Sequence, residues 1–168
     1  MLRTPGISEN AEESRAPRLA LFQPDIPQNA GAVLRLAACL GVGVEIVEPM
    51  GFLWDDRKLR RAGMDYAPRA RVTRHVSWPA FEAWRRGEGR RLVLFTTKGA
   101  IPLPEAKFLP GDILLFGAES SGVPDEVHAQ AGLRLAIPLV QGERSLNVAQ
   151  AAAIGIYTAL AGLGKLPV

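Results

Sequence analysis

The chain has 168 residues, of which 48% are hydrophobic and 22% are charged, and its formal net charge is +3. This length and composition are typical of one globular domain, and no apolar run approaches the roughly 20 residues that span a bilayer. The single cysteine, Cys39, excludes an intrachain disulfide and fits a reducing cytoplasm. Cys39, His75 and His128 lack metal-ligand spacing, so we expect no metal site.

The start of the chain differs from the rest. Residues 1–17 mix Glu with Ser, Pro and Gly, and they lack the basic-then-apolar pattern of a signal peptide. We expect a flexible tail at 1–17 and a single domain at 18–168.

From residue 18 onward, short apolar runs alternate with segments of helical periodicity. Strands are predicted, in chain order, at 19–23, 44–47, 92–95, 113–116 and 134–137. A basic helix or turn is predicted at 57–61, and helices at 29–40, 80–86, 124–129 and 147–163. In the first helix we expect Asn29 to be the cap and Cys39 to be a small core residue. This order of elements predicts an α/β fold, with a parallel sheet that helices cover on both faces.

Polar residues and glycines gather in three segments, 27–35, 116–124 and 137–147. Each segment follows a predicted strand or lies where a helix begins, and these are the places where an α/β protein binds ligands. We therefore expect the three segments to form one site. Structural alternatives stay open, because Ser120 or Ser121 could cap the helix at 124–129, and Ser145 or Asn147 could cap the closing helix.

The closing helix at 147–163 is almost uncharged and apolar around most of its surface. Such a helix must be buried, either in the core or against a second subunit. Arg35 falls on the apolar face predicted for the first helix, where a lone arginine usually extends its charged end to water.

Basic residues are concentrated between residues 57 and 75, where Asp65 is the single acidic residue. They are Arg57, Lys58, Arg60, Arg61, Arg69, Arg71 and Arg74. Local charge of this kind favours a polyanion, above all a nucleic acid. A solvated helix face is the alternative interpretation.

In order and spacing, the three polar segments resemble the motifs of the SPOUT (α/β-knot) methyltransferases, which use S-adenosylmethionine. The motifs are Asn29-x-Gly31-x-x-x-Arg35, Phe116-Gly117-x-Glu119-x-x-Gly122-x-Pro124, and Ile137-Pro138 with Ser145-Leu146-Asn147-Val148. Residues 48–66 and 72–75 resemble the TrmL family in particular, the tRNA wobble-nucleotide ribose 2′-O-methyltransferases. The similarity covers residue 18 to about residue 164.

The resemblance implies a C-terminal trefoil knot, a homodimer whose sites are built partly by the partner, and a cytoplasmic enzyme. It implies that S-adenosylmethionine lies against seven residues, Phe95, Thr96, Gly117, Glu119, Ile137, Ser145 and Leu146. The implied substrate is the wobble cytidine or uridine of tRNA, in leucine isoacceptors. The implied contacts to the anticodon stem-loop come from Arg57, Lys58, Arg60, Arg61, Arg74 and His75.

The resemblance also implies that Arg35 is the catalytic arginine, with supporting roles for Asn29, Glu119, Ser145 and Asn147. A guanidinium does not normally lose its proton. We therefore expect Arg35 to orient a phosphate and to stabilise negative charge on the ribose oxygen. Two alternatives are a related enzyme for ribosomal RNA or another tRNA position, and an RNA-binding protein that has lost catalysis.

Overall fold

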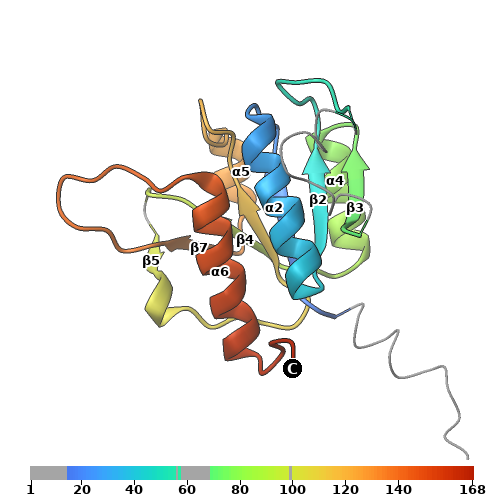
Figure 1. Ribbon diagram of the computed structural model, residues 1–168. Helices are drawn as coiled ribbons and strands as arrows, with labels where there is room; N and C mark the ends of the chain where they lie inside the picture. The colour runs from blue at the N-terminus through green and yellow to red at the C-terminus, as the bar shows by residue number, and fades with distance from the viewer. Residues whose placement is uncertain (1–14, 56, 58–68, 99) are drawn as a thin grey trace, which may run out of the picture.

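The computed structural model describes residues 15–55, 57, 69–98 and 100–168 (Figure 1). Its strands are β1 (Arg18–Phe22), β2 (Gly43–Val47), β3 (Arg71–His75), β4 (Leu92–Phe95), β5 (Ile101–Pro102), β6 (Ile113–Phe116) and β7 (Leu133–Ala136). Its helices are α2 (Pro27–Leu40), α4 (Trp78–Gly87), α5 (Asp125–Gln130), α6 (Val148–Gly162) and the short 3-10 helix η1 (Leu103–Glu105).

Within the described residues, the strands form one seven-stranded sheet in the order β3-β2-β1-β6-β4-β7-β5. Every neighbouring pair is parallel, so the carboxyl ends of all strands lie at the same edge. Helices α2 and α6 pack side by side on one face of the sheet, and α4 and α5 lie behind it (Figure 1). The predicted parallel α/β fold is confirmed. The trefoil knot stays a prediction.

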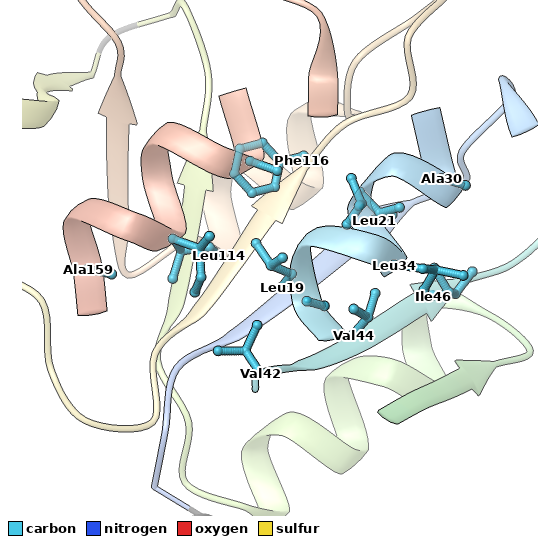
Figure 2. Close-up of a cluster of buried hydrophobic side chains, with 14 of the residues drawn as sticks. Leu19, Leu21, Ala30, Leu34, Val42, Val44, Ile46, Leu114, Phe116 and Ala159 are labelled. Atoms are coloured by element: carbon cyan, nitrogen blue, oxygen red, sulfur yellow. The ribbon is translucent and has the colours of Figure 1, made fainter. Parts of the chain in front are cut away.

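The core is divided between the two faces of the sheet because successive strand side chains point to opposite sides. Leu19 and Leu21 of β1 pack with residues of α2 and α6, as Figure 2 shows for this cluster. Ala20 and Phe22 of the same strand join the cluster beneath α4 and α5. The sheet is thus buried on both faces, as its nearly continuous apolar strands require.

Helix α2 begins earlier than predicted. Pro27 occupies its first turn, where the fixed φ of proline and its missing NH suit a helix start. Asn29 therefore lies inside the helix and is not its cap. The apolar face of α2 is buried, whereas Arg35 and Cys39 lie on an exposed stripe of the helix. The predictions that Arg35 lies on the apolar face and that Cys39 is a core residue were wrong.

A charged group is buried beneath α4. The Glu45 side chain is fully buried, and its Oε2 lies 2.7 Å from Nε2 of His75. Its Oε1 lies 2.6 Å from Nε of Arg18, as an ion pair outside hydrogen-bond alignment. His75 is 7% exposed and packs edge-on against Phe81. A buried His75 presents no surface to RNA, so the structure contradicts its prediction as an RNA-binding residue.

No helix of the described ranges has the length and apolar character needed to cross a membrane. Within those same ranges, no group of three or more His, Cys, Asp and Glu side chains is placed to hold a metal ion.

Candidate active site

A cavity of about 500 Å³ opens at the carboxyl ends of β4, β6 and β7. Residues from all three polar segments line it, and so do the ends of the strands between them. The seven residues predicted to bind the cofactor are all in its wall, namely Phe95, Thr96, Gly117, Glu119, Ile137, Ser145 and Leu146. Asn29 and Asn147 line the cavity as well. The structure thus brings together in one place residues that lie up to 118 positions apart in sequence.

Two stacked aromatic rings line the cavity. The rings of Phe95 and Phe116 have centroids 4.7 Å apart and an interplanar angle of 23°. Helix α6 passes against Phe95 at Gly155, where a Cβ would lie 2.7 Å from Cζ of the ring. Since real Cβ atoms do not approach carbon this closely, a glycine is required for the observed position of the ring.

The loop after β6 folds back on itself and so positions Glu119. The backbone NH of Ala118 donates to the Gly122 carbonyl at 3.1 Å, and the NH of Gly122 donates to the Ala118 carbonyl at 2.8 Å. A Cβ at Gly117 would lie 2.6 Å from the carbonyl carbon of Gly122, so the two backbone segments can touch here only because residue 117 is a glycine. Gly122 has a φ of +66°, which glycine adopts without strain.

A chain of polar contacts connects the three segments. Asn29 donates from Nδ2 to Oε1 of Glu119 at 3.2 Å, and its Oδ1 accepts from Nδ2 of Asn147 at 2.8 Å. Asn147 also caps α6, because its Oδ1 accepts from the NH of Ala149 at 2.9 Å. Asn147 is therefore both a helix cap and a member of the site.

Neither of the other proposed caps is used. Asn147, and not Ser145, caps α6, while Ser145 lies in the cavity wall. Helix α5 begins after Pro124 without a side-chain cap, so Ser120 and Ser121 do not serve it.

The prediction from sequence missed Asp25, which lies in the turn between β1 and α2. Its backbone NH donates to Oε2 of Glu119 at 3.0 Å, and the hydroxyl of Ser120 donates to its Oδ2. Burial raises the pKa of the Glu119 carboxyl above its ordinary value, and the hydrogen bond to the Asp25 side chain raises it further. Hydrogen bonds from the Glu119 and Ser120 side chains lower the pKa of Asp25 to about 2. The signal available in the sequence was an acidic residue three positions after the end of a buried strand.

Arg35 lies outside the set of described residues that line the cavity, on the exposed stripe of α2.

Of the residues predicted to bind RNA, Arg57 is exposed and Arg74 is largely exposed. The Arg74 Nε lies 2.6 Å from Oε1 of Glu48, and its guanidinium lies 5.5 Å from the centroid of the Trp54 ring. Lys58, Arg60 and Arg61 lie outside the described residues.

The model of the SpoU rRNA Methylase family matches residues 16–157. The chain belongs to this family. A curated relative in the family, the tRNA (cytidine(34)-2'-O)-methyltransferase of Beijerinckia indica, is 56% identical over 148 residues, which are 88% of this chain and 92% of the relative. These matches confirm the resemblance recognised in the sequence.

Solved structures of this methyltransferase family have the same fold. One, reported as "Structural insights into the 2-OH methylation of C/U34 on tRNA", superimposes with a TM-score of 0.82 at 45% identity and covers 90% of this chain and 98% of its own. An AdoMet-bound rRNA methyltransferase from Sinorhizobium meliloti superimposes with a TM-score of 0.81 at 26% identity and covers 88% of this chain and 57% of its own.

Proposed function

We propose that this enzyme transfers a methyl group from S-adenosylmethionine to the ribose 2′-hydroxyl of the wobble nucleotide of tRNA, at cytidine or uridine, in leucine isoacceptors. The observation that carries the proposal is the single cavity in which the three motif segments meet. Relatives named for methylation of cytidine 34 support the position within tRNA. The alternative of an RNA-binding protein without catalysis is disfavoured, because Asn29, Glu119 and Asn147 form a connected set at the cavity wall.

The cavity fits S-adenosylmethionine in size and chemistry. Its volume of about 500 Å³ lies in the range of roughly 300–1,000 Å³ usual for small-molecule sites. Stacked aromatic rings and the glycine loop at 117–122 offer an apolar wall and close access to backbone groups. When bound, S-adenosylmethionine supplies a methyl group on a sulfonium, and the ribose hydroxyl must lose its proton as it gains that methyl group.

The polar chain of the site has a positioning role in this proposal. Asn29 and Asn147 are fixed to one another, and Asn29 is fixed to Glu119, so that each side chain has one orientation. Fixed polar groups at the point where charge develops need no rearrangement during the reaction. Orientation of the reactants accounts for much of the rate of such transfers.

We propose further that the enzyme is a homodimer that pairs through the outer surface of α2 and α6. On α6, Ile154 is 41% exposed and Tyr157 is 55% exposed, although one face of the helix is in the core. Arg35 lies on the exposed stripe of the neighbouring α2. A dimer with a two-fold axis at this surface would bury these apolar side chains and bring Arg35 to the cavity of the partner.

Mixing variants tests the shared site. Arg35→Ala removes the arginine, and Gly155→Ala crowds the cavity through Phe95. The assay is run at a cofactor concentration below the wild-type Kd, where a 10-fold weaker affinity leaves Gly155→Ala with about a tenth of the wild-type rate. If Arg35 acts in the partner's cavity, refolding the two variants together then gives about a quarter of the wild-type rate, because half of the dimers are mixed and each has one intact site. An Arg35 that acts in its own subunit restores nothing.

The predicted RNA-binding residues of the basic stretch supply the proposed tRNA surface. Of these, the structure describes Arg57, Arg74 and His75, and His75 is excluded by its burial. Basic side chains of this kind position an RNA through its phosphates, while an unstacked base in the anticodon loop is recognised separately.

The decisive experiment maps ribose methylation on total tRNA after incubation with the pure protein and S-adenosylmethionine. We expect a new 2′-O-methyl group at position 34 of leucine tRNAs, and Arg35→Ala is expected to lose turnover while it still binds the cofactor in calorimetry. Methylation at another tRNA position or on ribosomal RNA alone would refute the proposed substrate. A fully active Arg35→Ala would refute the role of the arginine.

A further inference from the structure

Asp25 is held in the turn between β1 and α2, behind Glu119 and outside the cavity wall. On its other side lies Gly51, where a Cβ would come within 2.6 Å of Cβ of Asp25. The NH of Gly51 also donates to the carbonyl of Pro24 at 3.0 Å. The backbone of Asp25 is thus confined between the segment at residue 51 and the loop after β6.

Two contacts join Asp25 to that loop. Its backbone NH donates to Oε2 of Glu119, and its Oδ2 accepts from the hydroxyl of Ser120. The remaining carboxylate oxygen, Oδ1, has almost no exposed surface, and among the described residues it has no hydrogen-bond donor as long as Glu119 is ionised. A buried acceptor without a donor is unfavourable by about 1–3 kcal/mol, so a donor is expected nearby.

Glu119 can be that donor if it keeps its proton. Two carboxyl groups in contact do not both ionise readily, because their like charges repel. A protonated Glu119 can donate to Asp25 while its Oε1 accepts from Asn29, which leaves every polar atom of the pair with a partner. The pKa of Glu119 is raised and that of Asp25 is lowered, which likewise leaves the proton on Glu119 and the negative charge on Asp25.

We propose that Asp25 is a positioning residue, whose carboxylate shares one proton with Glu119 and so holds Glu119 as a fixed, neutral carboxyl group in the cavity wall. The effect on catalysis rests on the methyl transfer proposed above, whereas the shared proton can be measured whether or not the protein transfers a methyl group. The groups that act on the Glu119 carboxyl from the packed elements are Asp25 and Asn29, and of these two only Asp25 titrates.

The pair affects the rest of the site through Asn29. When Glu119 ionises beside the carboxylate of Asp25, repulsion favours its movement away from Asp25, and the bond from Asn29 to Oε1 is then lost. Asn29 is the partner of Asn147, so its orientation also loosens. The arrangement is therefore expected to weaken as the pH rises past the raised pKa of Glu119.

Carboxyl carbon NMR of the protein labelled with ¹³C glutamate tests the shared proton. The Glu119 signal is identified by its absence in Glu119→Gln. We expect its titration midpoint in the wild type to lie above that of ordinary glutamates, and Asp25→Asn to move it down toward theirs. The matched control is Asp125→Asn, the same chemical change at an exposed aspartate in the first turn of α5, and it leaves the midpoint in place. A midpoint that Asp25→Asn does not move overturns the proposal.

A second variant keeps the test decisive if Asp25→Asn does not fold. The amide of Glu119→Gln imitates the protonated carboxyl, because its NH₂ can donate to Asp25 while its oxygen accepts from Asn29. In the wild type, the folded state binds the Glu119 proton more tightly than the unfolded state does. The free energy of unfolding should therefore fall as the pH rises from the ordinary glutamate pKa to the raised one. Glu119→Gln should lack this fall, and a profile identical to the wild type overturns the proposal.

Methyl transfer to tRNA is measured on the same proteins. A displacement of Glu119 by about 1 Å is expected to lower kcat by up to about 100-fold in Asp25→Asn, with the rate of Asp125→Asn unchanged. A wild type that methylates no tRNA refutes the proposed function and leaves the NMR result to decide on the proton. An active wild type with an equally active Asp25→Asn refutes the positioning role.

Discussion

Gly155 leaves no room for a side chain between α6 and the Phe95 ring. In Gly155→Ala the added Cβ would lie 2.7 Å from Cζ and 2.9 Å from Cε1 of that ring. Carbon atoms in contact are separated by about 3.5–4.0 Å, so the ring must move by about 1 Å. Phe95 is stacked on Phe116, with the ring centroids 4.7 Å apart, and both residues line the cavity. We expect the ring to move into the cavity.

Two opposing effects act on stability. Overpacking of this kind costs about 1–3 kcal/mol, whereas alanine in place of glycine within a helix contributes about 0.5–1 kcal/mol. The expected net loss in the free energy of unfolding is about 0–2.5 kcal/mol, and the protein stays folded. Binding suffers more, because a ligand against Phe95 meets a displaced ring.

Calorimetric titration with S-adenosylmethionine and urea unfolding measure the two effects. We expect the Kd of Gly155→Ala to rise at least about 10-fold, which is 1.4 kcal/mol. The control is Gly162→Ala in the same helix, where a Cβ would meet nothing within 4 Å. It should bind as the wild type does and gain stability. If Gly155→Ala behaves like Gly162→Ala in both measurements, Phe95 does not form the wall of the cofactor site.

Four further variants, at three positions, address other parts of the molecule. Asn147→Ala removes the cap of α6 and should lower the free energy of unfolding, measured in urea, by about 1 kcal/mol. Asn147→Asp keeps the cap oxygen but loses the donor to Asn29, so it should lose turnover with little change in stability. Glu45→Gln should lower the free energy of unfolding, measured in urea, by about 3 kcal/mol, because it leaves the partly buried Arg18 without its counter-charge. A loss below about 1 kcal/mol would show that the ion pair contributes little to stability. Arg74→Ala should weaken tRNA binding and leave the cofactor affinity unchanged. The slope of log affinity against log salt concentration should become shallower by up to about 1, which corresponds to the loss of one phosphate contact. An unchanged slope would place Arg74 outside the RNA surface.

Most of the strands that the sequence revealed are buried on both faces, since a run such as Ile113–Phe116 is apolar throughout. Strand β7 was also predicted, although only Leu135 of its four residues is buried. Strand β3 was missed because it lies at the sheet edge, and three of its five residues are exposed. Strand β5 has only two residues, of which one is proline. An edge strand needs only one partner and tolerates charge, so its sequence has no apolar signature.

The sequence predicted which residues form the site but not the hydrogen bonds that connect them. Motif order located Asn29, Glu119 and Asn147, but the bonds between them depend on how the sheet brings distant loops together. Asp25 has no motif to mark it, and its importance comes from a contact 94 residues away. The apolar stripe predicted for α2 included Leu36 and Leu40, which are only partly buried. The buried side of the helix runs instead through Val33, Leu34 and Ala37, and this leaves Arg35 exposed.

Residues 145–151 complete the cavity, and they come from the last quarter of the chain. During synthesis the strands and the other walls are made first, so a chain that stops before α6 has strand ends but no enclosed site. A ligand of the cavity consequently binds only the fully assembled fold, and it stabilises that fold by about 2.7 kcal/mol at a concentration of 100 times its Kd. Availability of the ligand in the cell would therefore influence how long newly made chains survive, as well as how fast they work.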